Sequence, residues 1–97
     1  MNRAQRAASL DELVAVKVMG DERRSGGAPP AYSTDMRHAW AVIRRLREMG
    51  WEHDLMVVAD KHVVRFSRDG ESVMSGAETM PKATCLAALL AVGEGPV

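Results

Sequence analysis

The feature that most limits the possible folds is an Asp-Gly turn inside the segment SRDGES, residues 67–72. A type I′ turn needs positive φ at both central positions, and Asp-Gly flanked by β-like runs is a strong signal for it. A two-residue turn at Asp69-Gly70 pairs Phe66 with Val73. The segment therefore predicts an antiparallel hairpin whose register decides which side chains share a face.

A weaker turn signal at Asp60-Lys61 predicts another strand before this hairpin and hence a three-stranded antiparallel meander. A two-residue turn there pairs Val57 with Val64. Because alternate residues face opposite sides of a sheet, one face carries Leu55, Val57, Val64, Phe66 and Val73. The other face carries the apolar residues Met56, Val58, Val63 and Met74. Such a cluster needs a cover, so we treat these four residues as a possible apolar interface.

A 3.6-residue apolar rhythm predicts a helix within residues 32–51. Ser33 or Thr34 can cap its start. Gly50 suits the left-handed residue that ends it, and Trp51 can fold back onto its last turn. The face that we expect in the core consists of Met36, Ala39, Trp40, Val42, Ile43, Leu46 and Met49.

The opposite side of this helix is basic. Its possible interaction surface consists of Arg37, Arg44, Arg45 and Arg47. Such a stripe can contact phosphates, and Arg44 is spaced to form a cation–π contact with Trp40. The alternative is an ordinary solvated helix face, which is normal for an amphipathic helix.

Local signals also place helices near both ends of the chain. Ser9 and Glu12 form a capping box, which predicts a helix that ends near Gly20. Thr79 and Pro81 predict the start of a last helix, which is apolar on most of its surface and therefore buried.

The predicted class is α+β, with the order α-α-β-β-β-α. Residues 9–97 form a single domain after a flexible tail at 1–8. A Gly/Pro-rich loop occupies residues 21–31, and it is expected to be either a linker or a binding loop.

Three blocks carry a family resemblance. They are DELVAVKVMG at 11–20, PAYSTD at 30–35 followed by Trp40, and TMPKATCLAALL at 79–90. Together they resemble the phage ABA-sandwich domain, a set of small phage and prophage proteins defined by architecture rather than activity. The insertion DERRSGGAP at 21–29 departs from the family pattern.

The resemblance implies a sheet packed between helices, an α/β/α sandwich. On that basis we expect the central and last helices to cover the face with Leu55 and Phe66. We expect the N-terminal helix to cover the face with Met56 and Met74. The resemblance implies no catalytic or binding residues.

Charge and composition exclude several classes of protein. Thirteen basic and thirteen acidic residues give zero net charge, so no global field attracts nucleic acid or an anionic membrane. No apolar run approaches the roughly 18 residues that span a bilayer. The single Cys85 cannot form an internal disulfide, which is typical of a reducing compartment. We expect a cytoplasmic protein without a membrane partner, in the host cell if it is phage-encoded.

The candidates for metal binding or acid–base chemistry are His38, His53, His62, Asp54 and Asp60. No two histidines have ligand-like spacing. Cys85 near a helix start is either a reactive thiol or a packed core residue. We therefore expect no enzyme, no metal and no cofactor.

The leading hypothesis is a phage or prophage accessory protein of unknown biochemical activity. It would act as a non-catalytic protein-interaction module that binds a host or phage protein or forms a homo-oligomer. One alternative is a nucleic-acid-binding module, because helix, three strands and helix is also the order of a double-stranded-RNA-binding domain. Lys82 alone replaces the expected lysine cluster at the start of the last helix, which argues against RNA. The other alternative is a small-ligand binder that captures a nucleotide with the 21–31 loop and Tyr32.

Overall fold

The computed structural model describes residues 9–20 and 29–93. The first helix is α-helical as α2 and continues as a π-helical segment, η1. The elements are α2 (Leu10–Leu13), η1 (Val14–Val18), α3 (Met36–Glu48), β1 (Glu52–Val58), β2 (Lys61–Arg68), β3 (Glu71–Ala77) and α4 (Met80–Ala91). The α+β class and the order α-α-β-β-β-α are confirmed. The predictions for residues 1–8 and 21–28 fall outside the described residues.

The strands form an antiparallel meander in the order β1-β2-β3. The second turn is the predicted one. Asp69 and Gly70 have φ angles of 49° and 85°, as a type I′ turn requires. Phe66 pairs with Val73, which confirms the register between β2 and β3.

The first turn lies one residue earlier than predicted. Ala59 and Asp60 have φ angles of 47° and 71°, so a type I′ turn is centred on them. Val57 consequently pairs with His62 rather than with Val64. This turn type matches the twist of the two strands, so Ala59 adopts positive φ although it is not glycine. The pairing shifts by two residues, and every side chain therefore keeps its predicted face.

The capping box of the first helix is confirmed. The Glu12 amide donates to Ser9 Oγ, and the Ser9 amide donates to Glu12 Oε1, both at 3.1 Å. The cap of α3 differs from the prediction, because Asp35 rather than Ser33 or Thr34 accepts a helix amide, that of Arg37 at 2.9 Å. A carboxylate is favoured there by the positive end of the helix dipole.

The end of α3 has the predicted left-handed glycine. Gly50 has a φ of 96°. The Trp51 amide donates to the Leu46 carbonyl at 3.0 Å, and the Gly50 amide donates to the Arg47 carbonyl at 3.0 Å. This pair of bonds is a Schellman ending. It buries the Trp51 ring at the point where the chain enters β1.

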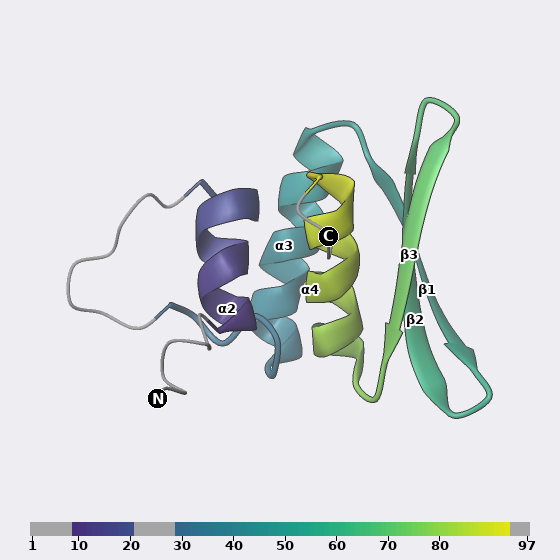
Figure 1. Cartoon of the computed structure of the whole chain (residues 1–97), viewed down its shortest axis with the longest axis horizontal. Coiled ribbons are helices and arrows are strands. Elements are labelled where there is room, and N and C mark those ends of the chain that lie inside the picture. Colours follow the sequence, from purple (N-terminus) through teal and green to yellow (C-terminus); the bar gives the residue numbers. More distant parts are fainter. Residues whose placement is uncertain (1–8, 21–28, 94–97) are drawn as a thin grey trace.

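The layers are stacked differently from the expected sandwich. In Figure 1 the sheet lies on one side, α3 and α4 form the next layer, and α2 with η1 lies beyond them. The N-terminal helix contacts α3 and α4, so the prediction that it covers the outer face of the sheet is wrong. The physical reason is that α4 is apolar on all sides and needs covers on both. Its buried residues are Ala83, Thr84, Cys85, Ala87, Ala88 and Leu89.

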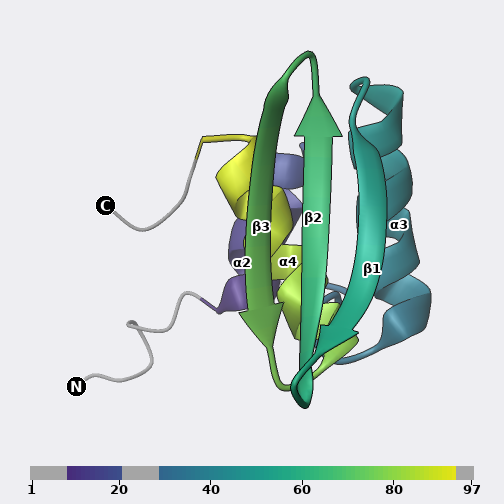
Figure 2. The ribbon, with the colours of Figure 1, turned by 90° about the vertical axis from the view of Figure 1, so that its right-hand side faces the viewer.

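The sheet covers α4 better than it covers α3. Helix α4 lies against β2 and β3, whereas α3 lies against β1, the edge strand. Figure 2 shows α3 projecting beyond β1. Trp40, predicted to be a core residue, is consequently 42% exposed, while Val42, Ile43 and Leu46 are buried as predicted.

Two polar contacts attach the N-terminal helix to the rest of the fold. The Ser33 amide donates to Asp11 Oδ1 at 2.7 Å. Arg45 Nε donates to the Val18 carbonyl at 3.1 Å. Val14 and Val18 are fully buried beneath these contacts. The helix is therefore docked firmly, and the described segments on either side of residues 21–28 are held together.

Candidate functional site

The outer face of the sheet carries a single apolar cluster. Met56 lies directly opposite Val63, and Val58 follows two residues further along β1. Met74 on β3 lies diagonally from Val63. Val58 is 54% and Met74 56% exposed, while Met56 and Val63 are half-buried. No described helix lies over the outer face of the sheet (Figure 1).

The charged side chains on the outer face balance one another. Arg65 pairs directly with Asp54 across the strands, and Arg65 Nη2 lies 2.8 Å from Asp54 Oδ2. The strand alternation puts Glu52 and Lys61 on the same face. Two acids and two bases therefore surround the apolar cluster, and the face has no net charge.

The four arginines of α3 do not form one free basic stripe. Arg37 is bound to its own helix cap, with Nη2 2.8 Å from Asp35 Oδ2. The hydrogen bond from the Arg37 side chain is the main reason why the pKa of Asp35 falls to about 2. Arg45 is used to hold η1 through Val18, and its Nη1 also lies 3.9 Å from Glu48.

Arg44 and Arg47 differ from the other two arginines. Both are exposed, and neither has an acidic partner among residues 9–20 and 29–93. Within the described part of the chain, the predicted basic surface thus keeps two guanidinium groups on α3 that have no acidic partner.

A second candidate surface, which was not predicted from the sequence, lies at the edge of the sheet beside α3. Trp40 packs edge-on against His53 of β1, with ring centroids 6.1 Å apart. Val57, further along β1, is 66% exposed, although it belongs to the helix-side face. The meander order, which makes β1 an edge strand, was the signal that could have identified this surface.

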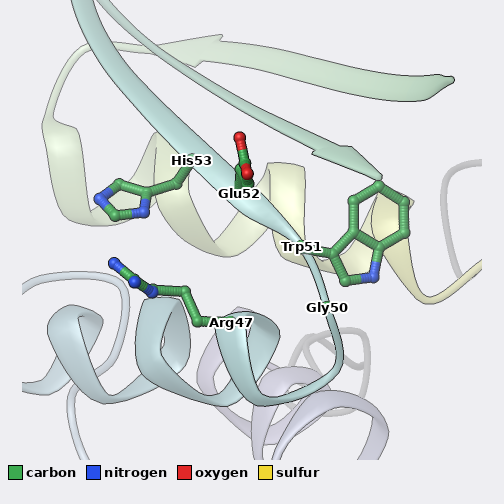
Figure 3. A pocket seen from close by; sticks show the side chains of 5 residues that line it. All are labelled: Arg47, Gly50, Trp51, Glu52 and His53. Carbon is green, nitrogen blue, oxygen red and sulfur yellow. The ribbon is translucent and has the colours of Figure 1, made fainter. Parts of the chain in front are cut away.

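A shallow cavity of about 420 Å³ lies at the end of this edge, lined by Arg47, Gly50, Trp51, Glu52 and His53. Figure 3 shows Arg47 reaching from α3 toward His53 on β1, while Trp51 turns away from them. The cavity is open and carries a guanidinium, an imidazole and the Glu52 carboxylate. It is suited to a polar group rather than to an apolar ligand.

Arg68 holds the connection between α3 and β1 in place. Its guanidinium carbon lies 4.4 Å from the centre of the Trp51 ring, a cation–π contact. Its Nη1 donates to the Met49 carbonyl at 3.1 Å. This clamp fixes the backbone from which Arg47 and His53 project. The cation–π contact at Trp51 was not predicted.

The remaining candidates offer little chemistry. Cys85 is fully buried, and burial, with a smaller effect of Asp11, raises its pKa to about 12. Since the thiolate is the nucleophile, burial disfavours the reactive form of this thiol, which supports the alternative of a packed core residue. His53 and His62 lie at opposite ends of the sheet. Among the described residues no cluster of three metal-ligating side chains occurs.

Comparison with known proteins identifies the family. Residues 12–89 match the phage ABA sandwich domain. The chain belongs to this family. A phage protein from Bacillus cereus ATCC 14579, known from its crystal structure, is similar at 25% identity with a TM-score of 0.78. The similarity covers 91% of this chain and 88% of that one. No curated protein matches the chain.

The family name describes a sheet between two helical layers. In this member the described helices all lie on one face of the sheet. None of the helices in the described part of the chain is long and apolar enough to span a membrane.

Proposed function

We propose that this ABA sandwich protein is a non-catalytic protein-interaction module whose outer sheet face binds a second copy of the chain. The observation that carries the proposal is the open cluster of Met56, Val58, Val63 and Met74. Its strands are already held by the opposite face, where Val64 and Phe66 are fully buried. The outer apolar side chains are therefore not needed to attach the sheet to the helices.

A second copy suits this face because the face complements itself. Two sheets pack about 10 Å apart with their strands within about 30° of each other. All described helices lie behind the sheet, so none obstructs such an approach (Figure 2). The face is electrically balanced, so two copies meet without net repulsion. A three-stranded face is smaller than the roughly 800 Å² per partner of a standard interface, so we expect a weak dimer.

Sedimentation velocity over a range of protein concentrations tests the proposal. The wild type should pass from monomer to dimer, and Met74→Glu should remain monomeric because it adds a carboxylate to the apolar cluster, opposite Arg65, and gives the balanced face a net negative charge. Val16→Glu is the matched control, since Val16 is a similarly exposed apolar residue on η1. A wild type that stays monomeric at about 1 mM, or an unchanged dimer in Met74→Glu, would overturn the proposal.

An accessory role in the cytoplasm of a phage-infected or prophage-carrying host remains part of the proposal. The structure gives less support to the two alternatives. For nucleic-acid binding, two of the four arginines are already engaged within the fold, Arg37 by Asp35 and Arg45 by the Val18 carbonyl. For nucleotide capture, the Tyr32 ring is buried and does not present a surface to a ligand.

A further inference from the structure

The edge of the sheet at β1 lies above a helical layer that is wider than the sheet. Neighbouring strands lie about 4.8 Å apart, whereas packed helices lie about 8–10 Å apart. Two helices thus cover more width than three strands. Helix α4 packs against β2 and β3, and α3 projects past β1 (Figure 2). There is room over α3 for one more strand beside β1.

The side chains at this edge are those that another strand would cover. Trp40 is 42% and Val57 66% exposed on the helix side of the edge, and Val58 is 54% exposed on the outer side. Edge strands are usually protected by charged residues, proline or bulges. The stretch Leu55–Val58 has no charged residue and no proline, so it lacks the first two protections.

The backbone of β1 also has hydrogen-bonding groups to offer. Val58 and Lys61 flank the two-residue turn and form a hydrogen-bonded pair, as such hairpins require. Hydrogen-bonded pairs alternate along an antiparallel ladder, so the amide and carbonyl groups of Val57, Leu55 and His53 point to the open edge. These groups form a ready template for an added strand.

The charge at the edge determines what kind of strand fits. Arg44 and Arg47 lie on α3 next to Trp40, and both are unpaired among the described residues. A strand added beside β1 would point alternate side chains toward them. Acidic residues at those positions would form charge-assisted pairs.

We propose that β1 captures an extended acidic segment of another protein as a fourth strand over α3. The acidic side chains of the segment face Arg44 and Arg47, and its apolar side chains lie on the outer side with Val58. This site goes beyond the proposed dimer, because it uses the edge of the sheet instead of its outer face. A second copy of the chain fits the edge poorly. Pairing β1 with β1 across a two-fold axis brings the two α3 helices together, with Arg44 and Arg47 of both copies side by side.

A pair of short peptides tests the proposal on the full chain. The probe is a peptide of about eight residues that alternates Glu and Val, and its control alternates Lys and Val. Binding is followed by tryptophan fluorescence and by amide NMR. The Glu peptide should bind saturably and shift the amides of β1, whereas the Lys peptide should bind at least about tenfold more weakly, equivalent to about 1.4 kcal/mol. Equal binding of both peptides, or no binding at about 1 mM, would overturn the proposal.

Two sets of variants separate backbone capture from simple charge attraction. Val57→Pro removes an outward amide at a position where an edge strand tolerates proline, and Val57→Thr keeps that amide. Of these two substitutions, only Val57→Pro should weaken binding of the Glu peptide. Arg44→Glu with Arg47→Glu should weaken it about tenfold, whereas Met74→Glu should leave it unchanged. Thermal melts check that each variant is folded. A Val57→Pro variant that is folded and binds like wild type would overturn strand addition.

A competition experiment on the same protein distinguishes a nucleic-acid-binding site from a site for an acidic protein segment. A single-stranded oligonucleotide that binds through Arg44 and Arg47 with steep salt dependence, and that displaces the Glu peptide, would replace the proposal with nucleic-acid binding. Absence of oligonucleotide binding supports the acidic segment. The outcome does not depend on dimerisation, because Met74→Glu tests the outer face separately.

Discussion

The two faces of the sheet are built from the same three strands and have similar apolar content, but they have different fates. On the inner face Val64 and Phe66 are fully buried against α4. On the outer face Val58 and Met74 remain more than half exposed. The difference shows that hydrophobic side chains alone do not decide which face becomes the core. Where the helices pack decides it.

The largest predicted effect comes from truncating the inner face. Phe66→Ala should lower the free energy of unfolding by about 3–5 kcal/mol, because it removes a buried ring and leaves a cavity. Met74→Ala on the outer face should change it by no more than about 0.5 kcal/mol in the monomer. Urea denaturation at low protein concentration measures both.

Phe66→Leu keeps most of the apolar volume and should cost about 1 kcal/mol. It provides a measurable value if Phe66→Ala does not fold. If Met74→Ala lowered the free energy of unfolding as much as Phe66→Ala, the outer face would have to be covered in the monomer. The contrast between the two faces would then fail.

The assignment of residues to faces was predictable from the sequence because its causes are local. A type I′ turn at Asp69-Gly70 fixes one register. The period of two along a strand then propagates that register through the sheet. The misplaced first turn did no harm, since an error of two residues in pairing leaves the faces unchanged. Helix ends were similarly predictable, as the capping box at Ser9 and the Schellman ending at Gly50 show.

The packing of the helical layers was not predictable, because it depends on contacts distant in sequence. Helix α4 is apolar all round, so its sequence does not indicate which side faces the sheet. Both sheet faces were apolar enough to accept the N-terminal helix. Trp40 belongs to the same 3.6-residue rhythm as Ile43, and only the position of β1 at the edge leaves it half-exposed. The edge site was missed for that reason.

An intermediate effect is expected at the turn that joins β2 to β3 and sets the register of the two faces. Gly70 has a φ of 85°, so Gly70→Ala should cost about 1–2 kcal/mol through backbone strain. Gly76→Ala is the matched control on β3. Its added Cβ would lie 3.5 Å from Val63 Cγ2, an ordinary contact on the outer face.

Gly76→Ala should therefore be neutral or stabilise the fold by up to about 1 kcal/mol, because it restricts the unfolded chain. Thermal and urea unfolding of the two variants measure the difference. Equal destabilisation by both substitutions would show that the loss of a glycine, rather than the positive φ of the turn, accounts for the cost in stability.

The smallest predicted effect concerns the Asp54–Arg65 pair at the centre of the outer face. A double-mutant cycle with Asp54→Asn and Arg65→Gln should give a coupling of about 0.2–1 kcal/mol in the monomer, and salt should reduce it, because both side chains are solvated. In the proposed dimer the pair is covered, and removal of one partner leaves a buried charge, which raises the coupling. The cycle measured below and above the dimerisation range thus tests the comparison directly. A coupling energy that increases with protein concentration means that the outer face is buried in the dimer. A constant coupling means that it stays a surface.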